Sequence, residues 1–142
     1  MYTGLLHLHS ILRYVVLILV LLSIFQALAA GDKPYTASNK KVNLFALISA
    51  HIQLLLGLAL YIHSPNVDFS RMSEPTFRYW NVEHISMMIL AIVLITIGYS
   101  KSKKALETKS KHRAIYIYYT LAIVIVLLAI FTMKDRNPWW NM

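Results

Sequence analysis

Four long apolar runs constrain this chain more than any other feature of its sequence. They cover about residues 11–30, 43–62, 79–100 and 114–133. A helix of ~20 residues spans the ~30 Å of hydrocarbon in a bilayer. Inside lipid every backbone N–H and C=O group must be paired within its own segment. We therefore expect four transmembrane helices, despite the many β-branched residues in these runs.

The composition agrees with a chain that lies mostly in lipid. Hydrophobic residues make up 58% of the 142 residues and charged residues only 14%, whereas soluble domains carry about 25% charged residues. The length predicts one domain, residues 1–142. There is no cysteine, which excludes disulfides, cysteine-ligated zinc or Fe–S clusters, and covalently attached haem.

The connections between the runs predict an all-α, up-down four-helix bundle. Gly31 and Pro34 end the first run, and Ser64 and Pro65 end the second. Because the connections 31–41 and 101–113 are short, neighbouring helices are expected to be antiparallel. The connection 64–78 is the longest and is expected to carry a short surface helix or a lid.

The distribution of Lys and Arg predicts the orientation of the bundle. The connections 31–41 and 101–113 hold nine of these residues and the opposite side holds five, and cytoplasmic loops are the more basic ones. Both termini are therefore expected on the non-cytoplasmic side. An interfacial aromatic belt there is predicted to contain Tyr79, Trp80, Trp139 and Trp140. We assign the net charge of +8 to orientation and to contact with anionic lipid, not to nucleic acid.

Small and polar residues of each run share one helical face. In the first run a 4-3-4-3-4 spacing joins His9, Arg13, Val16, Val20, Ser23 and Ala27. The second face gathers Leu47, Ala50, His51, Gly57, Leu58 and Tyr61, and the third repeats His84, Ala91 and Gly98 at sevens. Three faces thus carry a histidine, and ionisable groups inside a membrane are usually functional. His112, between Lys111 and Arg113, is instead expected in a solvated charge cluster.

The three histidines on the helical faces, His9, His51 and His84, are candidate ligands of a haem b. Such a haem needs one or two imidazoles from facing helices and an apolar slot, for which Gly57 and Gly98 could make room. Arg13 and Arg78 are candidate clamps for its propionates. At ~1.5 Å per residue, His9 and His84 differ in depth by ~7 Å, and His51 and His84 by ~9 Å. This spacing does not choose an axial pair among the three candidates His9, His51 and His84.

Other functions fit the same residues. His7 and His9 with the methionines of the third run could bind copper, and His51, Gln53 and Tyr61 could bind a quinone headgroup. The polar faces could equally serve a non-catalytic accessory or assembly subunit of a larger membrane complex, or a homo-oligomer. With six carboxylates, mostly in connections, and no phosphate loop or nucleophile triad, an electron carrier or accessory subunit is favoured over a stand-alone enzyme.

Three stretches carry a resemblance to a known family. They are His7–Tyr14 (HLHSILRY), Ala50–Tyr61 (AHIQLLLGLALY) and Arg78–Met88 (RYWNVEHISMM). In these the chain resembles small bacterial four-helix membrane proteins labelled cytochrome b-like, over nearly its whole length. The resemblance implies haem b and electron transfer carried by His9, His51 and His84. It also implies a bacterial inner membrane, with periplasmic termini and a quinone or a respiratory-complex subunit as partner.

Overall fold

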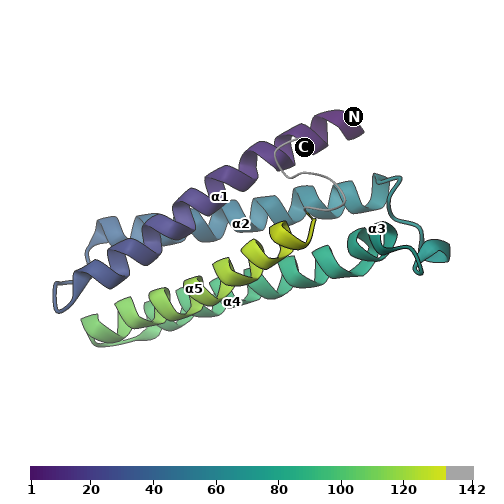
Figure 1. Cartoon of the computed structure of the whole chain (residues 1–142). Helices are drawn as coiled ribbons and strands as arrows, with labels where there is room; N and C mark the ends of the chain where they lie inside the picture. The colour runs from purple at the N-terminus through teal and green to yellow at the C-terminus, as the bar shows by residue number, and fades with distance from the viewer. Residues whose placement is uncertain (134–142) are drawn as a thin grey trace.

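The structure, a computed structural model, describes residues 1–133 as a helical bundle (Figure 1). Trp139 and Trp140 of the predicted belt lie outside the described residues. The four long helices are α1 (Tyr2–Ala30), α2 (Ala37–His63), α4 (His84–Lys104) and α5 (Thr108–Met133). The connection between α2 and α4 contains a 3₁₀ turn (Phe69–Arg71), the short helix α3 (Pro75–Arg78) and a π-helical turn (Tyr79–Glu83). The all-α prediction is confirmed, and the expected short surface helix is present.

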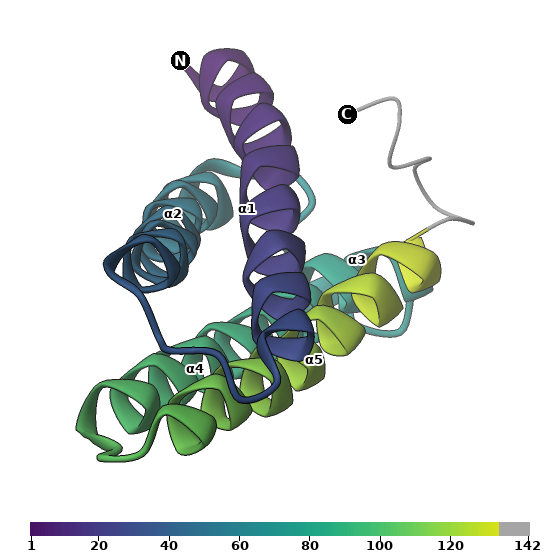
Figure 2. The ribbon, with the colours of Figure 1, turned by 90° about the vertical axis from the view of Figure 1, so that its left-hand side faces the viewer.

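The helices run up and down in two antiparallel pairs. α1 packs on α2, and α4 packs on α5. The pairs are joined by contacts of α1 with α5 and of α2 with α4, and they cross at an angle when viewed from the end (Figure 2). The start of α1 and helix α3 lie at one end of the bundle, and the short connections α1–α2 and α4–α5 lie at the other (Figure 1).

Local sequence signals explain where the first helices end. Gly31 follows α1 with φ +56°, a left-handed conformation that glycine adopts without steric cost. Thr36 begins α2 with a capping box: its Oγ1 accepts from the N–H of Asn39, and Asn39 Oδ1 accepts from the N–H of Thr36. Such reciprocal bonds satisfy helix N–H groups that have no partner inside the helix.

The outer surface of the bundle is apolar. Each of the four long helices is long and apolar enough to cross a membrane. For α4 this segment includes the turns before it and runs from Pro75 to Lys104. Large side chains such as Phe25, Leu55 and Phe131 are about two-thirds exposed, which lipid tolerates and water does not. The helices extend beyond the predicted spans: α1 begins at Tyr2 and not near Ile11, because helical structure continues through the interface.

The two halves of the bundle are packed differently. In the half toward the α1–α2 and α4–α5 connections, small and β-branched residues from all four helices form a closed core, which includes Val20, Ala46, Ile95, Ile115 and Ala122. In the other half α1 diverges from the α4–α5 pair (Figure 1). The candidate functional site lies in that more open half.

One surface prediction is wrong at the closed end. His112 is only 4% exposed, not part of a solvated cluster. The α1–α2 connection folds across the start of α5, so that His112 Nε2 lies 3.3 Å from the carbonyl of Lys33. The ring of Tyr35 packs against the imidazole edge-to-face, with 5.2 Å between ring centroids.

Candidate functional site

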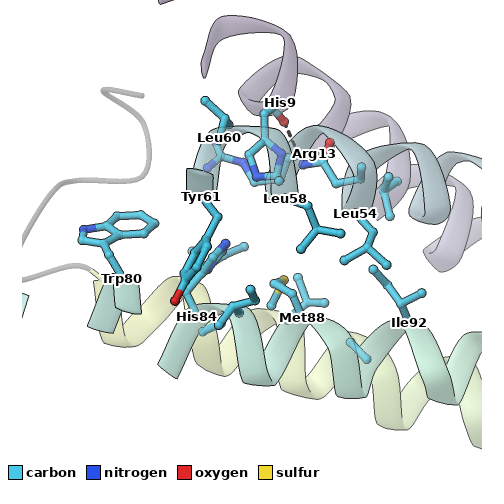
Figure 3. Close-up of a pocket in the computed structure, with 18 of the residues that line it drawn as sticks. His9, Arg13, Leu54, Leu58, Leu60, Tyr61, Trp80, His84, Met88 and Ile92 are labelled. Atoms are coloured by element: carbon cyan, nitrogen blue, oxygen red, sulfur yellow. Dashed lines mark hydrogen bonds between the residues drawn. The ribbon is translucent and has the colours of Figure 1, made fainter. Parts of the chain in front are cut away.

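An internal cavity of about 270 Å³ opens between α1, α2 and α4 in the half of the bundle that holds α3 (Figure 3). Its walls are mostly aliphatic and include Leu54, Leu58, Met88 and Ile92. The polar groups on it come from separate elements. They are His9 and Arg13 of α1, Gln53 and Tyr61 of α2, Tyr79 and Trp80 of the π-helical turn, and His84 at the start of α4.

Two predicted histidines meet at this cavity. His9 extends from α1 and His84 from α4 into the same space (Figure 3). Their ring centroids lie 6.5 Å apart and their planes are 73° apart. The separation of the two rings is thus no larger than the ~7 Å depth difference expected from residue counting alone. The cavity joins imidazoles from two spans, as the sequence-based hypothesis required.

Gly57 makes room for the His9 ring. A Cβ added to Gly57 would lie 3.2 Å from His9 Cε1 and 3.8 Å from His9 Nδ1. The imidazole therefore rests against the bare backbone of α2. Gln53, one turn earlier, donates from Nε2 to the His9 carbonyl at 2.8 Å. These two residues of α2 hold His9 in place.

The π-helical turn positions His84. In an α-helix five residues rotate by ~500°, which would put Tyr79 and His84 on different faces. Here the N–H of His84 bonds to the carbonyl of Tyr79, an i→i+5 bond that aligns the two side chains. Tyr79 Oη lies 3.4 Å from His84 Nδ1 and donates to the carbonyl of Ala129 at 2.7 Å.

This geometry selects a tautomer of His84. Because the Tyr79 proton is directed to Ala129, the phenol oxygen can only accept from His84. His84 is then protonated at Nδ1, and its Nε2 carries the free lone pair. Tyr79 is fully buried. Tyr79 of the predicted interfacial belt thus points into the bundle, and the half-buried Trp80 also lines the cavity.

A polar network ties the α2–α4 connection to the site. The Tyr61 hydroxyl donates to the carbonyl of Asn81 at 2.8 Å. Asn81, itself 2% exposed, donates from Nδ2 to the carbonyl of Asp68 at 2.8 Å. Because Ser64, Asn66 and Val67 also line the cavity, this connection forms one of its walls; a role as a lid stays a prediction.

Several buried polar atoms at the cavity have no hydrogen-bond partner among residues 1–133. They are Nδ1 of His9, Oε1 of Gln53 and Nε1 of Trp80. Buried polar groups are normally paired, and an unpaired one costs roughly 1–3 kcal/mol. The Trp80 indole is held by edge-to-face contact with Tyr79, at 4.9 Å between ring centroids. These atoms mark the places where a ligand's polar groups would bind.

Arg13 adds positive charge to the cavity. Its side chain lines the cavity one turn from His9, and its Nη2 lies 3.2 Å from Tyr14 Oη. The guanidinium also stacks on the Tyr14 ring, 4.8 Å from the ring centroid. The site thus pairs one fixed cation with two imidazoles in apolar surroundings.

Two of the predicted site residues lie elsewhere. His51 is exposed and does not line the cavity; its Nδ1 lies 2.8 Å from the carbonyl of Leu47, and its Nε2 lies 3.4 Å from Thr96 Oγ1. Arg78 is also outside and pairs with Glu83 at 3.4 Å. The structure therefore brings together His9, Arg13 and His84, and it separates His51 and Arg78 from them.

Comparisons with protein-family models, curated proteins and solved structures find no match for this chain. The function is therefore argued from the site alone. Within the described part of the chain, no group of three or more His, Asp or Glu side chains is placed to hold a metal ion. The site offers two imidazoles, not a complete protein-made coordination sphere.

Sequence reasoning did not assign Tyr79, Trp80 and Gly57 their roles. A π-helical turn has no local sequence signature, so residues 79–84 look like a continuous α-helix. Gly57 was expected to make room for a macrocycle, but it accommodates an imidazole. Gly98 lies away from the cavity: a Cβ there would come within 2.6 Å of Tyr118 Cβ. Gly98 therefore serves the contact between α4 and α5.

Proposed function

We propose that this protein binds a haem b between α1 and α4 and carries electrons within the membrane. The observation that carries the proposal is the pair of imidazoles, 6.5 Å apart between centroids, on one cavity. A metal–nitrogen bond is about 2.0 Å long, and the ligating nitrogen lies about 1.1 Å from the centre of its ring. Two imidazoles on opposite sides of one metal would therefore have ring centroids about 6.2 Å apart. The separation of His9 and His84 is close to this value.

The number of protein ligands also supports haem over a bare metal ion. A haem supplies four ligands itself and needs only one or two from the protein. A copper or zinc ion needs three or four, and the described residues offer no such group. His7, which would complete the copper hypothesis, is exposed and does not line the cavity.

The surrounding residues have distinct roles in this proposal. His84 would ligate through Nε2, because Tyr79 holds its other nitrogen. His9, supported by Gly57 and Gln53, would be the opposite ligand. Arg13 would pair with a propionate. A bound haem would supply one-electron transfer at a potential set by ligand identity and burial.

The orientation is part of the proposal. The more basic connections lie at the closed end of the bundle, and the positive-inside rule assigns that end to the cytoplasm. The cavity would then lie in the outer half of a bacterial inner membrane. A membrane quinone or a subunit of a respiratory complex would exchange electrons there.

The test is the absorption spectrum of the detergent-purified protein, expressed with ample haem precursor. We expect a Soret band that shifts on reduction by dithionite. His9→Ala and His84→Ala should each change or abolish the band. His51→Ala and His63→Ala remove exposed imidazoles and serve as matched controls. A colourless wild-type protein, or full colour in both cavity variants, would rule out the haem proposal.

A quinone is the second candidate ligand, and the size of the cavity favours it over haem, for which α1 and α4 would have to move apart. Ligand pockets usually measure about 300–1,000 Å³, and this one, at about 270 Å³, suits a small headgroup. The Nε1 of Trp80, which has no partner among residues 1–133, would donate to a quinone oxygen. Solvent extraction of the purified protein followed by chromatography tests this directly. A quinone retained by wild type and lost in Trp80→Phe would support it, and its absence from both would reject it.

A further inference from the structure

A second hollow lies at the opposite end of the bundle, where α4 turns into α5. It is a shallow depression, largely open to its surroundings, of about 340 Å³. Lys101, Ser110 and Arg113 form its polar side, and Ala114, Ile117 and Tyr118 form its apolar side. The two sides follow one another along α5, so the polar groups lie near the loop and the apolar groups lie deeper along the helix.

Among residues 1–133, no ion pair neutralises the positive charge of this hollow, and no carboxylate lines it. The ion pairs within residues 1–133 are Arg71–Glu74 and Arg78–Glu83, at the other end of the bundle. Within the described part of the chain, Lys101 and Arg113 therefore face the hollow without a carboxylate partner.

The neighbouring Lys111 has a different role. Its Nζ donates to the carbonyl of Ser102 at 3.0 Å and lies 3.4 Å from the carbonyl of Lys103. These carbonyls belong to the last turn of α4, where helix carbonyls have no partner in the helix and attract cations. Lys111 thus stabilises the helix end, whereas the Lys101 ammonium lies over the Tyr118 ring, 5.4 Å from its centroid.

We propose that this hollow binds the phosphate headgroup of an anionic membrane lipid. The hollow lies at the ends of two membrane-crossing helices, where headgroups are found. Basic pockets between transmembrane helices at this level bind anionic headgroups. The phosphate would contact Lys101, Arg113 and the Ser110 hydroxyl. The first part of an acyl chain would lie along Ile117 and Tyr118.

Native mass spectrometry of the full chain in detergent can test this site. The probes are phosphatidylglycerol and, as a zwitterionic comparison, phosphatidylcholine. We expect phosphatidylglycerol to be retained preferentially, and Lys101→Gln/Arg113→Gln to weaken its binding by about 30-fold. Lys103→Gln/Lys104→Gln removes the same charge from exposed positions of the same helix end and should leave the affinity within a few-fold of wild type.

Other outcomes would overturn the proposal. Equal losses in both double variants would mean general surface attraction and no site. Equal retention of the two lipids would remove the role of charge. Complete displacement by millimolar inorganic phosphate would identify a soluble-anion site, because the apolar wall would then contribute nothing. None of these readouts depends on haem, so the result is independent of the function proposed above.

Discussion

Gly98→Ala is the substitution whose effect the structure defines most sharply. The new Cβ would lie 2.6 Å from Tyr118 Cβ and 3.4 Å from the carbonyl of Ala114. Carbon atoms in contact are normally about 3.5–4.0 Å apart. Since both Cβ positions are fixed by backbone, no rotamer relieves the clash, and α4 and α5 must separate by roughly 1 Å. Overpacking of this kind costs about 1–3 kcal/mol.

The assay is the free energy of unfolding in mixed micelles, measured by helical circular dichroism. Gly4→Ala is the matched control because nothing lies within 4 Å of its added Cβ. It should leave stability unchanged or raise it slightly, since alanine favours helix by up to about 1 kcal/mol. Gly98→Ala should be the less stable variant by about 1–3 kcal/mol. Equal stability of the two variants would refute the close contact of α4 with α5.

Gly57→Ala should have the opposite profile. Its new Cβ meets His9 Cε1 at 3.2 Å, and an imidazole at the edge of a cavity can swing away. We expect a small change in unfolding free energy, within about 1 kcal/mol. The absorption spectrum of the proposed bound haem should change, because His9 moves. Gly98→Ala should leave the spectrum per folded molecule unchanged. The reverse pattern would show that Gly98, not Gly57, belongs to the site.

Two further predictions concern hydrogen bonds near the site. Tyr79→Phe removes the bond to the Ala129 carbonyl and should lower the free energy of unfolding by about 1 kcal/mol. It should also abolish the preference of His84 for a proton on Nδ1, which ¹⁵N chemical shifts report. An unchanged tautomer would contradict the assignment. In the α2–α4 connection, hydrogen bonds from Ser70 lower the pKa of Asp68 below its ordinary 3.8. That turn is therefore stabilised above pH 3.8 and loosens as the pH falls through the lowered pKa; the Ser70 amide shift should report it, and a midpoint at or above 3.8 would contradict it.

The bundle follows from the sequence because lipid leaves few alternatives. Four apolar runs must form helices, and short connections make them antiparallel. Helix ends were also predictable, since Gly31 and the Ser64–Pro65 pair are local signals. The lengths were underestimated because hydropathy marks the hydrocarbon boundary, not the end of the helix.

The inward face of α2 shows how a small error moves a site residue. Four residues of the predicted face, Ala50, Gly57, Leu58 and Tyr61, do line the cavity, together with Gln53, Leu54 and Leu60. The observed face is therefore rotated toward Gln53 by less than the ~100° that separates successive residues. His51 was at the edge of the predicted face, and this rotation turns it outward. In the structure His51 is exposed and Gln53 faces the cavity.

The placement of His84 depends on packing that no local pattern specifies. The π-helical turn Tyr79–Glu83 holds one more residue per hydrogen-bonded turn than an α-helix, which rotates the side chains before α4 relative to those in it. That rotation lets Tyr79 reach Ala129 and lets Asn81 reach the connection before it. These partners lie 50 and 13 residues away in sequence. A single sequence without homologues contains no signal for such pairings.

The contrast between the two ends of the bundle is the strongest argument that the cavity is functional. At the closed end, small and aliphatic residues fill the core between the four helices, and the buried polar groups there, such as Asn43 and His112, pack against Tyr35 of the α1–α2 connection. The same bundle could close its other end in that way, because helices in lipid associate well through small residues. Instead that end holds two imidazoles, a guanidinium and an indole N–H that has no hydrogen-bond partner among residues 1–133. Because burying such groups costs free energy, they are the reason why we propose that a ligand binds at this end.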